Sequence, residues 1–292
     1  MTVPNWAAAE STPRPAPLLS ARGLVKEFVS RSPLGFKKGG VRAVNKVDLD
    51  LYKGETYGLV GESGSGKSTT GRLLQGLIVP TAGEITLAGE VMDTTARDSM
   101  QIRRDIQIIF QDPHSSLNPR RRVRHILEEA LRIIGEKNTK MIRERVKESL
   151  NAVGFTEEHA ERFPHEFSGG QRQRIGIARA LMVEPKVLIC DEPVSALDVS
   201  IQAQVLNLLR KLQRERGLTY LFISHDMSVV RYLADRVGVM LNGELVEENN
   251  AAALYTDPQH SYTQKLLSSV PVQHPSQRQE KSRRYSASAG LT

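Results

Sequence analysis

The residues GESGSGKST at positions 61–69 form a glycine-rich loop suited to holding phosphate. They fit the pattern Gly-x-x-x-x-Gly-Lys-Ser between an apolar strand and a helix-like segment, as this chemistry requires. Glycines let successive backbone N–H groups curl around phosphate oxygens, and the helix N-terminus that follows adds its dipole. Lys67 is expected to neutralise the β- and γ-phosphates, and the Ser68 hydroxyl to ligate Mg²⁺.

A pair of carboxylates ends another apolar strand. The stretch KVLICDE (186–192) finishes in Asp191 and Glu192. Beside a phosphate loop, Asp191 is suited to holding Mg²⁺, and Glu192 to polarising a water for in-line attack on a γ-phosphate. The alternative is a solvated strand end with no chemistry. Cys190, within the strand, is expected to be a small core residue.

Two further polar residues follow apolar strands. Gln111 comes after IIF, and His225 comes after LFIS. In a parallel sheet, ligands collect at the carboxyl ends of the strands. A glutamine there can bind water or metal, and a histidine can donate to a phosphate oxygen. Taken singly, each residue is more typical of an ordinary surface group than of a site, and it is their shared position after strands that makes them site candidates.

A second anion-binding pattern lies about a hundred residues after the glycine-rich loop. In HEFSGGQRQRIGIARAL (165–181), Ser168, Gly169 and Gly170 open a predicted helix with one apolar face. A helix N-terminus with glycines offers free N–H groups and a partial positive charge to a phosphate. The sequence therefore predicts a second phosphate contact, separate from the first.

The chain alternates between strand and helix patterns. Buried strands are predicted at 55–60, 106–110, 186–190 and 219–224, and antiparallel strands or hairpins at 83–91 and 237–248. After the glycine-rich loop, a helix face is predicted from Thr70, Leu73, Leu74 and Leu77. The Asn242-Gly243 pair suits a type I′ turn.

Helical patterns interrupt this alternation. Apolar spacing predicts helices from Val123 to Ile134 and from Ile142 to Val153, stopping near Gly135 and Gly154. We expect a disordered N-terminal segment (1–17), one α/β domain (18–272) with a helical subdomain inserted at about 113–172, and a disordered basic tail (273–292).

Composition limits the remaining classes. The chain has 292 residues, 39% hydrophobic and 25% charged, with a net charge of +7 and a single cysteine. One cysteine excludes an internal disulfide framework and fits a reducing compartment. No apolar run approaches the ~20 residues of a membrane span, and no secretory signal is evident, so a cytoplasmic location is expected. Few aromatics and no base-reading motif argue against a nucleic-acid partner.

Taken together and in order, these motifs resemble those of the ATP-binding subunits of ABC transporters. They are the glycine-rich loop, Gln111, FSGGQ, ICDEP, SALD and ISHD, and the resemblance covers about residues 18–271. The stretches FQDPHSSLNPR, CDEPVSALDVSIQAQVLNLL and DPQHSYTQKLLSSVP are similar to the oligopeptide/dipeptide importer branch. The resemblance implies an α/β P-loop NTPase of the ABC ATPase type. Its RecA-like core would carry an antiparallel β subdomain and the inserted helical subdomain.

The resemblance also implies a role for each matching residue. The implied catalytic residues are Lys67, Gln111, Glu192 and His225, and the implied Mg²⁺ ligands are Ser68, Gln111 and Asp191. ATP contacts are implied for Phe28, Gly61, Glu62, Ser63, Gly64, Ser65, Gly66, Lys67, Ser68, Thr69, Ser168, Gly169, Gly170, Gln171 and Asp198. Phe28 would stack on adenine, with Phe36 as a nearby alternative. Phe167 stands where leucine is more usual, and its side chain is expected to pack rather than touch phosphate.

The same resemblance implies partners. A second ATP-binding subunit, a paralogue or a copy of this chain, would pack head to tail, so that the second phosphate contact of one subunit caps ATP on the other. Two transmembrane permease subunits would dock on the helical subdomain and the region 111–122, and a solute-binding protein would act through them. The chain would then be a peripheral protein on the cytoplasmic face of the cell membrane.

Other functions are compatible with parts of the same sequence. An importer of another solute, such as nickel, or an exporter would use the same ATPase chemistry. An ABC-type ATPase acting on nucleic acid or ribosomes is a further alternative. Members of that kind carry two such domains in one chain, or a long coiled coil between the two halves of the domain, and this sequence shows neither pattern. A soluble P-loop kinase would have no evident use for FSGGQ and SALD.

Overall fold

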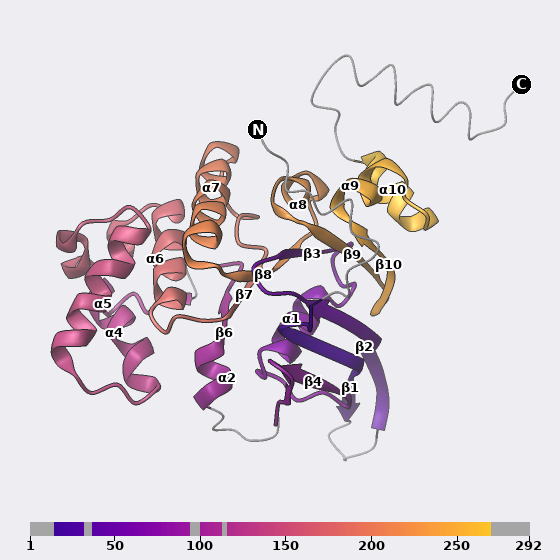
Figure 1. Ribbon diagram of the computed structural model, residues 1–292, viewed down its shortest axis with the longest axis horizontal. Coiled ribbons are helices and arrows are strands. Elements are labelled where there is room, and N and C mark those ends of the chain that lie inside the picture. The colour runs from indigo at the N-terminus through magenta and orange to yellow at the C-terminus, as the bar shows by residue number, and fades with distance from the viewer. Residues whose placement is uncertain (1–14, 32–36, 94–99, 113–115, 270–292) are drawn as a thin grey trace, which may run out of the picture.

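The computed structural model describes residues 15–31, 37–93, 100–112 and 116–269 (Figure 1). The predicted basic tail, most of the predicted N-terminal segment and Phe36 lie outside the described residues. The domain boundaries expected from the sequence therefore stay predictions.

A mostly parallel sheet forms the centre of the described structure. Its strand order is β10-β9-β3-β8-β7-β6, and only β10 runs antiparallel to its neighbour. The strands of this sheet are β3 (Thr56–Val60), β6 (Ile106–Ile109), β7 (Val187–Asp191), β8 (Thr219–Ser224), β9 (Arg236–Leu241) and β10 (Glu244–Asn250). Every residue of β3, β7 and β8 is buried, which explains their continuous apolar sequences.

An antiparallel sheet packs beside it, with the order β2-β1-β4-β5. Its strands are β1 (Leu19–Arg31), β2 (Lys37–Leu51), β4 (Ala82–Leu87) and β5 (Glu90–Val91). The short hairpin of β4 and β5 confirms the prediction at 83–91. The hairpin of β9 and β10 is also confirmed, with Asn242 and Gly243 both at positive φ, as a type I′ turn requires.

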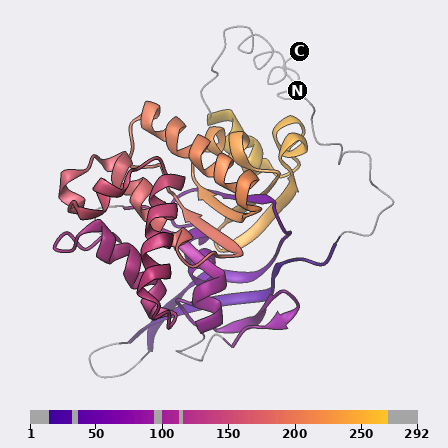
Figure 2. The same ribbon diagram turned by 60° about the vertical axis from the view of Figure 1, so that its left-hand side comes forward.

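Helices surround the parallel sheet, and a separate helical group lies at one end of the molecule (Figures 1 and 2). Around the sheet lie α1 (Lys67–Leu74), α2 (Met100–Asp105), α7 (Val199–Arg216), α8 (Met227–Leu233), α9 (Ala251–Thr256) and α10 (Ser261–Ser269). The helical group contains α4 (Val123–Ile133), α5 (Thr139–Ala152) and α6 (Gly169–Leu181). It lies between β6 and β7 in the chain, where the helical insertion was predicted.

The helix ends follow local signals. Gly135, Gly154 and Gly217 adopt positive φ just beyond α4, α5 and α7, a backbone conformation that ends helices. One prediction is wrong: Leu77 does not continue the buried face of α1. The helix ends at Leu74, Gly76 has φ +74°, and Leu77 is 54% exposed, because the glycine turns the chain away from the core.

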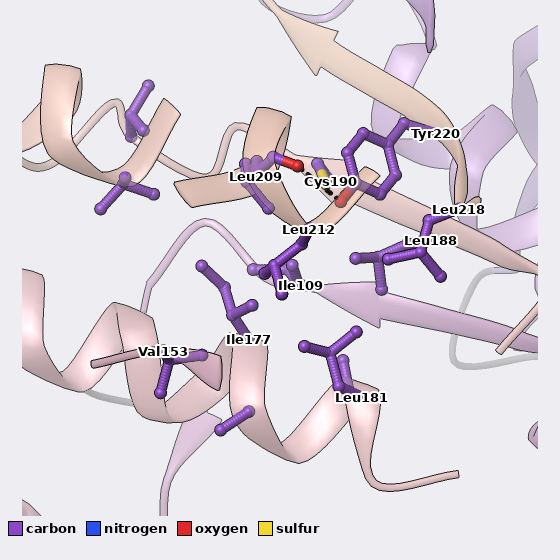
Figure 3. Close-up of a cluster of buried hydrophobic side chains, with 14 of the residues drawn as sticks. Ile109, Val153, Ile177, Leu181, Leu188, Cys190, Leu209, Leu212, Leu218 and Tyr220 are labelled. Carbon is purple, nitrogen blue, oxygen red and sulfur yellow. Dashed lines mark hydrogen bonds between the residues drawn. The ribbon is translucent and has the colours of Figure 1, made fainter. Parts of the chain in front are cut away.

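One hydrophobic cluster joins the helical group to the parallel sheet. Figure 3 shows Ile177 and Leu181 of α6 beside Ile109 of β6 and Leu188 of β7. Cys190 is fully buried in this cluster, as its predicted core role requires, and burial raises the pKa of its thiol strongly. A second cluster fills the space between the antiparallel sheet, α1 and the other face of the parallel sheet.

The stretch NPRRRVR (118–124) contains four arginines, and three of them form ion pairs. Arg121 pairs with Glu129 at 2.9 Å, and both Arg122 and Arg124 pair with Glu161 at 2.9 and 2.8 Å. Much of the positive charge in this run is therefore balanced within the helical group. Among the described residues, no helix combines the length and apolar character needed to cross a membrane.

Candidate nucleotide-binding site

The loop between β3 and α1, which we call the phosphate loop (Gly61–Gly66), is confined by the backbone around it. Gly64 and Gly66 have φ +81° and +104°, values that favour glycine. A Cβ on Gly66 would lie 2.2 Å from the carbonyl oxygen of Ala43, so no larger residue fits. Gly66 is also the N-cap of α1, and it has no side chain to cap the first N–H groups, which leaves them available to an anion.

Lys67 lies inside the phosphate loop. Only 4% of the residue is exposed, and its Nζ donates to the carbonyl oxygens of Gly61 at 2.7 Å and Glu62 at 2.8 Å. Burial lowers the pKa of Lys67, and the nearby carboxylates of Glu192 and Asp191 act against that shift. The ammonium group is thus held at the centre of the loop.

Asp191 connects the end of β7 to the start of α1. The Ser68 hydroxyl donates to Asp191 Oδ1 at 2.7 Å, and Asp191 is 4% exposed. Burial raises the pKa of Asp191, and the hydrogen bond from Ser68 counteracts this effect. A hydroxyl and a carboxylate from two different elements therefore meet behind the phosphate loop.

Glu192 lies between two polar residues that follow neighbouring strands. Its Oε2 accepts a hydrogen bond from Gln111 Nε2 at 3.1 Å, and its Oε1 lies 3.2 Å from His225 Nδ1. The Glu192 side chain is only 14% exposed. Because β6, β7 and β8 are adjacent parallel strands, their carboxyl ends bring these three side chains together.

These residues surround one cavity of about 680 Å³. The residues lining the cavity are Ala43, Gly61, Glu62, Ser63, Gly64, Gly66, Lys67, Ser68, Thr69, Gln111, Glu192, His225, Leu266 and Ser269. Two other candidates, Ser65 and Asp191, are buried immediately behind it, where Ser65 accepts a hydrogen bond of 3.3 Å from Lys67. Most candidates that the sequence analysis placed in the first phosphate site thus meet at one place.

The second predicted phosphate contact, which we call the signature segment (Ser168–Gln171), is separate from this cavity. Ser168 caps α6, accepting from the Gln171 N–H at 3.4 Å, and Gln171 Oε1 accepts from the Ser168 N–H at 2.9 Å. Within the described part of the chain, no residue of this segment lines the cavity. It packs instead beside the start of α7, as the close approach of Gly170 and Ile201 shows: a Cβ on Gly170 would lie 2.2 Å from Ile201. Asp198 is the N-cap of that helix.

Phe28 and Phe167 occupy different environments. Phe28 lies on β1, is 47% exposed and has Lys26 Nζ 5.3 Å from its ring centroid. It is paired with Val41, two residues before the cavity residue Ala43, but it does not itself line the described cavity. Phe167 is 3% exposed and packs edge-on against Phe155, in keeping with its expected packing role.

Sequence reasoning missed the contribution of α10. Leu266 and Ser269 line the cavity, and the Tyr262 hydroxyl accepts a hydrogen bond of 2.9 Å from the Glu62 N–H. These residues lie about 200 positions after the phosphate loop and form no phosphate-binding pattern. The stretch DPQHSYTQKLLSSVP resembles one transporter branch, but that resemblance does not predict that any of its side chains contacts the phosphate loop.

The phosphate loop, its buried lysine and the adjacent strand-end carboxylates define a P-loop NTPase. A family model described as "ABC transporter" matches residues 44–195. The oligopeptide transport ATP-binding protein OppF of Bacillus subtilis is 53% identical over 261 residues, 88% of this chain and 84% of that protein. The glutathione import ATP-binding protein GsiA of Salmonella choleraesuis is 53% identical over 89% of this chain, which spans only 42% of that protein's length.

A solved structure extends the comparison. It is a dimeric ATP-binding cassette in a post-hydrolysis state, bound to ADP and Pi, and it matches with a TM-score of 0.68 and 30% identity. The match covers 80% of this chain and 98% of that one. The chain belongs to the ABC transporter family, and its fold is that of the family's ATP-binding cassette. The fold class predicted from the sequence is thereby confirmed.

Proposed function

We propose that the chain is the ATP-hydrolysing, energy-coupling subunit of an ABC importer for oligopeptides or dipeptides. The observation that carries the proposal is the meeting of Lys67, Gln111, Glu192 and His225 around a single cavity bounded by the phosphate loop. The importer assignment is supported by the 53% identity to OppF, an oligopeptide transport protein, over 84% of its length.

In this proposal the phosphate loop and the start of α1 hold the phosphates of ATP. The N–H groups from Gly61 to Thr69 would turn toward phosphate oxygens, and Lys67 would exchange its carbonyl contacts for the β- and γ-phosphates. The positive φ of Gly64 and Gly66 supports this role, because it gives the loop a curvature that residues with side chains rarely adopt. Phe28, near the end of β1, and Ala43, in the middle of β2, would face the adenine.

The donor set behind the loop fits Mg²⁺. Ser68, Asp191 and Gln111 offer a hydroxyl, a carboxylate and an amide oxygen, which are the hard ligands that Mg²⁺ prefers. The described residues contain no group of three or more His, Cys, Asp or Glu side chains able to hold a metal by themselves. Mg²⁺ bound with a nucleotide is usually held by only one or two carboxylates, together with phosphate oxygens and waters, so a site with the single carboxylate of Asp191 suffices. The ion would supply charge neutralisation at the phosphates.

Glu192 is proposed as the general base. It would accept a proton from water as the water oxygen bonds to the γ-phosphorus and the bond to the β-phosphate oxygen breaks, so that ADP leaves with the electron pair. Gln111 and His225 each contact one oxygen of the Glu192 carboxylate, which supports a role for both in orienting it. The other ring nitrogen of His225 could then donate to a γ-phosphate oxygen.

A second ATP-binding subunit would complete the site. Ser168 and Gln171 of the signature segment are exposed at the start of α6, and the segment lies away from this chain's own cavity. Its proposed target is therefore ATP on the phosphate loop of a partner subunit. Asp198, beside it at the start of α7, would face the same interface. The partner would be a copy of this chain or a paralogue, and donors from both subunits would stabilise the charge of the transferring phosphoryl group.

The remaining partners follow from the importer assignment. Two transmembrane permease subunits would dock on the helical group and the region 111–122, with the chain on the cytoplasmic face of the membrane. A solute-binding protein would deliver the peptide to them. Because the ATPase does not contact the cargo, an importer for glutathione or nickel would use the same chemistry.

Transport by the assembled complex tests the proposal. The full chain, co-purified with its membrane subunits and solute-binding protein, is placed in proteoliposomes, and uptake of labelled oligopeptide, glutathione and Ni²⁺ is measured with and without ATP. We expect ATP-dependent uptake of the peptide and none with Glu192→Gln. Uptake of Ni²⁺ or glutathione alone would overturn the substrate assignment, and absence of ATP hydrolysis would overturn the enzymatic one.

A further inference from the structure

The C-terminal helix α10 forms one wall of the nucleotide cavity. Leu266 and Ser269 line the cavity together with the phosphate loop, and Tyr262, at the start of the helix, is 9% exposed. The Tyr262 hydroxyl accepts a hydrogen bond of 2.9 Å from the backbone N–H of Glu62, the second residue of the loop. This helix lies outside residues 44–195, the part of the chain that the family model matches.

The start of α10 is fixed by its own contacts. Glu247, on β10, accepts hydrogen bonds from the backbone N–H groups of Gln259 at 2.8 Å and His260 at 3.0 Å. His260 Nδ1 in turn accepts from the Tyr262 N–H at 3.2 Å, and the Tyr262 ring belongs to the main buried cluster. The Tyr262 hydroxyl is therefore presented to the loop by an anchored element.

The backbone of Glu62 is held at both its N–H and its carbonyl group. Its N–H donates to Tyr262, and its carbonyl oxygen accepts from Lys67 Nζ at 2.8 Å and from the Ser65 N–H at 3.2 Å. On the opposite side, a Cβ added to Gly61 would lie 2.2 Å from the carbonyl oxygen of Met240. The first turn of the loop thus lies between β9 and α10, and the residue that Tyr262 holds is also a partner of Lys67.

We infer that Tyr262 is a positioning residue for nucleotide binding, which holds the first turn of the phosphate loop in the shape that receives the phosphates of ATP. Tyr262 acts through the Glu62 peptide and does not itself touch the nucleotide. The inference rests on the proposed function, because it requires that the phosphate loop binds ATP. It adds a residue from the C-terminal helix to the elements that set nucleotide affinity.

The substitution Tyr262→Phe tests this role, because it removes the hydroxyl and keeps the ring. Loss of one hydrogen bond is expected to weaken binding of ATP with Mg²⁺ by the full chain about fivefold in calorimetric titration. In hydrolysis, KM for ATP rises by a similar factor while kcat stays near the wild-type value. Hydrogen exchange at the Glu62 amide becomes faster, because its acceptor is gone.

Tyr220→Phe is the matched control. The Tyr220 hydroxyl donates to the Leu209 carbonyl oxygen at 2.9 Å in the core, so this variant also loses one hydrogen bond between a tyrosine hydroxyl and the backbone. We expect Tyr220→Phe to lower the melting temperature about as much as Tyr262→Phe does, while its ATP affinity equals that of the wild type.

Two outcomes would overturn the inference. If Tyr262→Phe binds ATP as tightly as the wild type, or loses no more affinity than Tyr220→Phe, Tyr262 has only a structural role. If the wild-type chain itself fails to bind ATP, the proposed function falls and the inference falls with it. If the wild-type chain binds ATP and Tyr262→Phe binds it with the same affinity, only the positioning role of Tyr262 is overturned, and the proposed function stands.

Discussion

Glu192 Oε1 lies 3.2 Å from His225 Nδ1 at the carboxyl edge of the parallel sheet. The other oxygen of the same carboxylate accepts a hydrogen bond from Gln111, so residues after β6 and β8 hold Glu192 from both sides. Glu192 also has φ +48°, an uncommon conformation for a residue with a side chain, and its N–H donates to the Ile223 carbonyl oxygen at 3.0 Å. This backbone geometry turns the carboxylate out of the strand and into the cavity.

Glu192→Gln is expected to abolish turnover while ATP binding persists. The amide keeps the size and one hydrogen-bond acceptor of the carboxylate, but it cannot accept a proton from water. Loss of a general base lowers kcat by about 10²–10⁴-fold. Phosphate release and ATP titration on the same preparation measure the two effects separately.

Glu215→Gln provides the control for this substitution. Glu215 is 57% exposed on α7 and forms a weak ion pair with Lys211, at 3.8 Å, so its variant should hydrolyse ATP at the wild-type rate. Undiminished hydrolysis by Glu192→Gln would remove Glu192 as the base.

Lys67→Ala should weaken nucleotide binding itself. The side chain is buried in the phosphate loop, and its ammonium group would otherwise face the β- and γ-phosphates. Losing a charge-assisted contact of about 1.5–3 kcal/mol predicts roughly 10- to 150-fold weaker ATP binding. Titration with ATP and Mg²⁺ checks it, with the exposed Lys211→Ala as control. Equal affinity in Lys67→Ala and Lys211→Ala would contradict the assignment.

Much of the fold follows from local patterns. Some signals depend only on residues close together in the sequence: glycines that follow apolar helices, alternating apolar residues in strands, and the Asn242-Gly243 turn. The elements that these signals predicted are present. The motifs after strands were likewise predictable, because parallel strands place their carboxyl ends at one edge. The failure at Leu77 has a local cause too: apolar spacing continued past Gly76, whose positive φ ended the helix.

Contacts between distant residues that carry no sequence pattern could not be predicted. Tyr262 and Glu62 are 200 positions apart, and a tyrosine that binds a backbone N–H carries no sequence pattern. Arg236 is a second case, because nothing in its neighbourhood indicates that its side chain will be largely covered by β3 and by the connection before it. Such contacts arise from how the sheets pack together.

Ser168→Arg should spare ATP binding and block hydrolysis. The signature segment lies outside the chain's own cavity, so a bulky cation there leaves the phosphate loop intact but obstructs the proposed partner nucleotide. Loss of preorganised donors predicts a fall in kcat of about 10²–10³-fold. ATP titration and phosphate release distinguish the two effects.

Asn138→Arg is the matched control for this prediction. Asn138 caps α5 through hydrogen bonds from the Lys140 and Met141 N–H groups, so its loss also removes an exposed helix cap, at a cost of about 1 kcal/mol. This variant should retain hydrolysis. Equal activity in Ser168→Arg and Asn138→Arg would count against a role for Ser168 at a partner's nucleotide.

Arg236 joins the two sheets at the edge opposite the nucleotide cavity. Its guanidinium contacts Glu55 at 3.1 Å, pairs with Glu248, and lies 5.2 and 5.1 Å from the ring centroids of Tyr52 and Tyr57. The Arg236 and Glu55 side chains are each only 12% exposed. Since these partners come from the connection between β2 and β3, from β3 itself and from β10, Arg236 is a cross-link between elements.

Arg236→Met is expected to destabilise the fold by about 3–5 kcal/mol, because it leaves the Glu55 carboxylate buried without a cation. Chemical denaturation at neutral pH measures the change. Arg22→Met is the control: Arg22 pairs with Asp50 but is 53% exposed, so its loss should cost less than about 1 kcal/mol. Similar losses in the two variants would contradict a buried role for the Arg236 pair.

The pH dependence of Arg236→Met provides a further test. Burial raises the pKa of Glu55, while a backbone hydrogen bond from Tyr52 and the charge of Arg236 act against that rise, so removing Arg236 raises this pKa further. A carboxyl with a higher pKa in the folded than in the unfolded state favours folding at low pH, and this contribution is lost as pH rises through the folded pKa. The stability deficit of Arg236→Met should therefore be smaller at pH 5 than at pH 8. An equal deficit at both values would mean that the buried Glu55 charge is not its source.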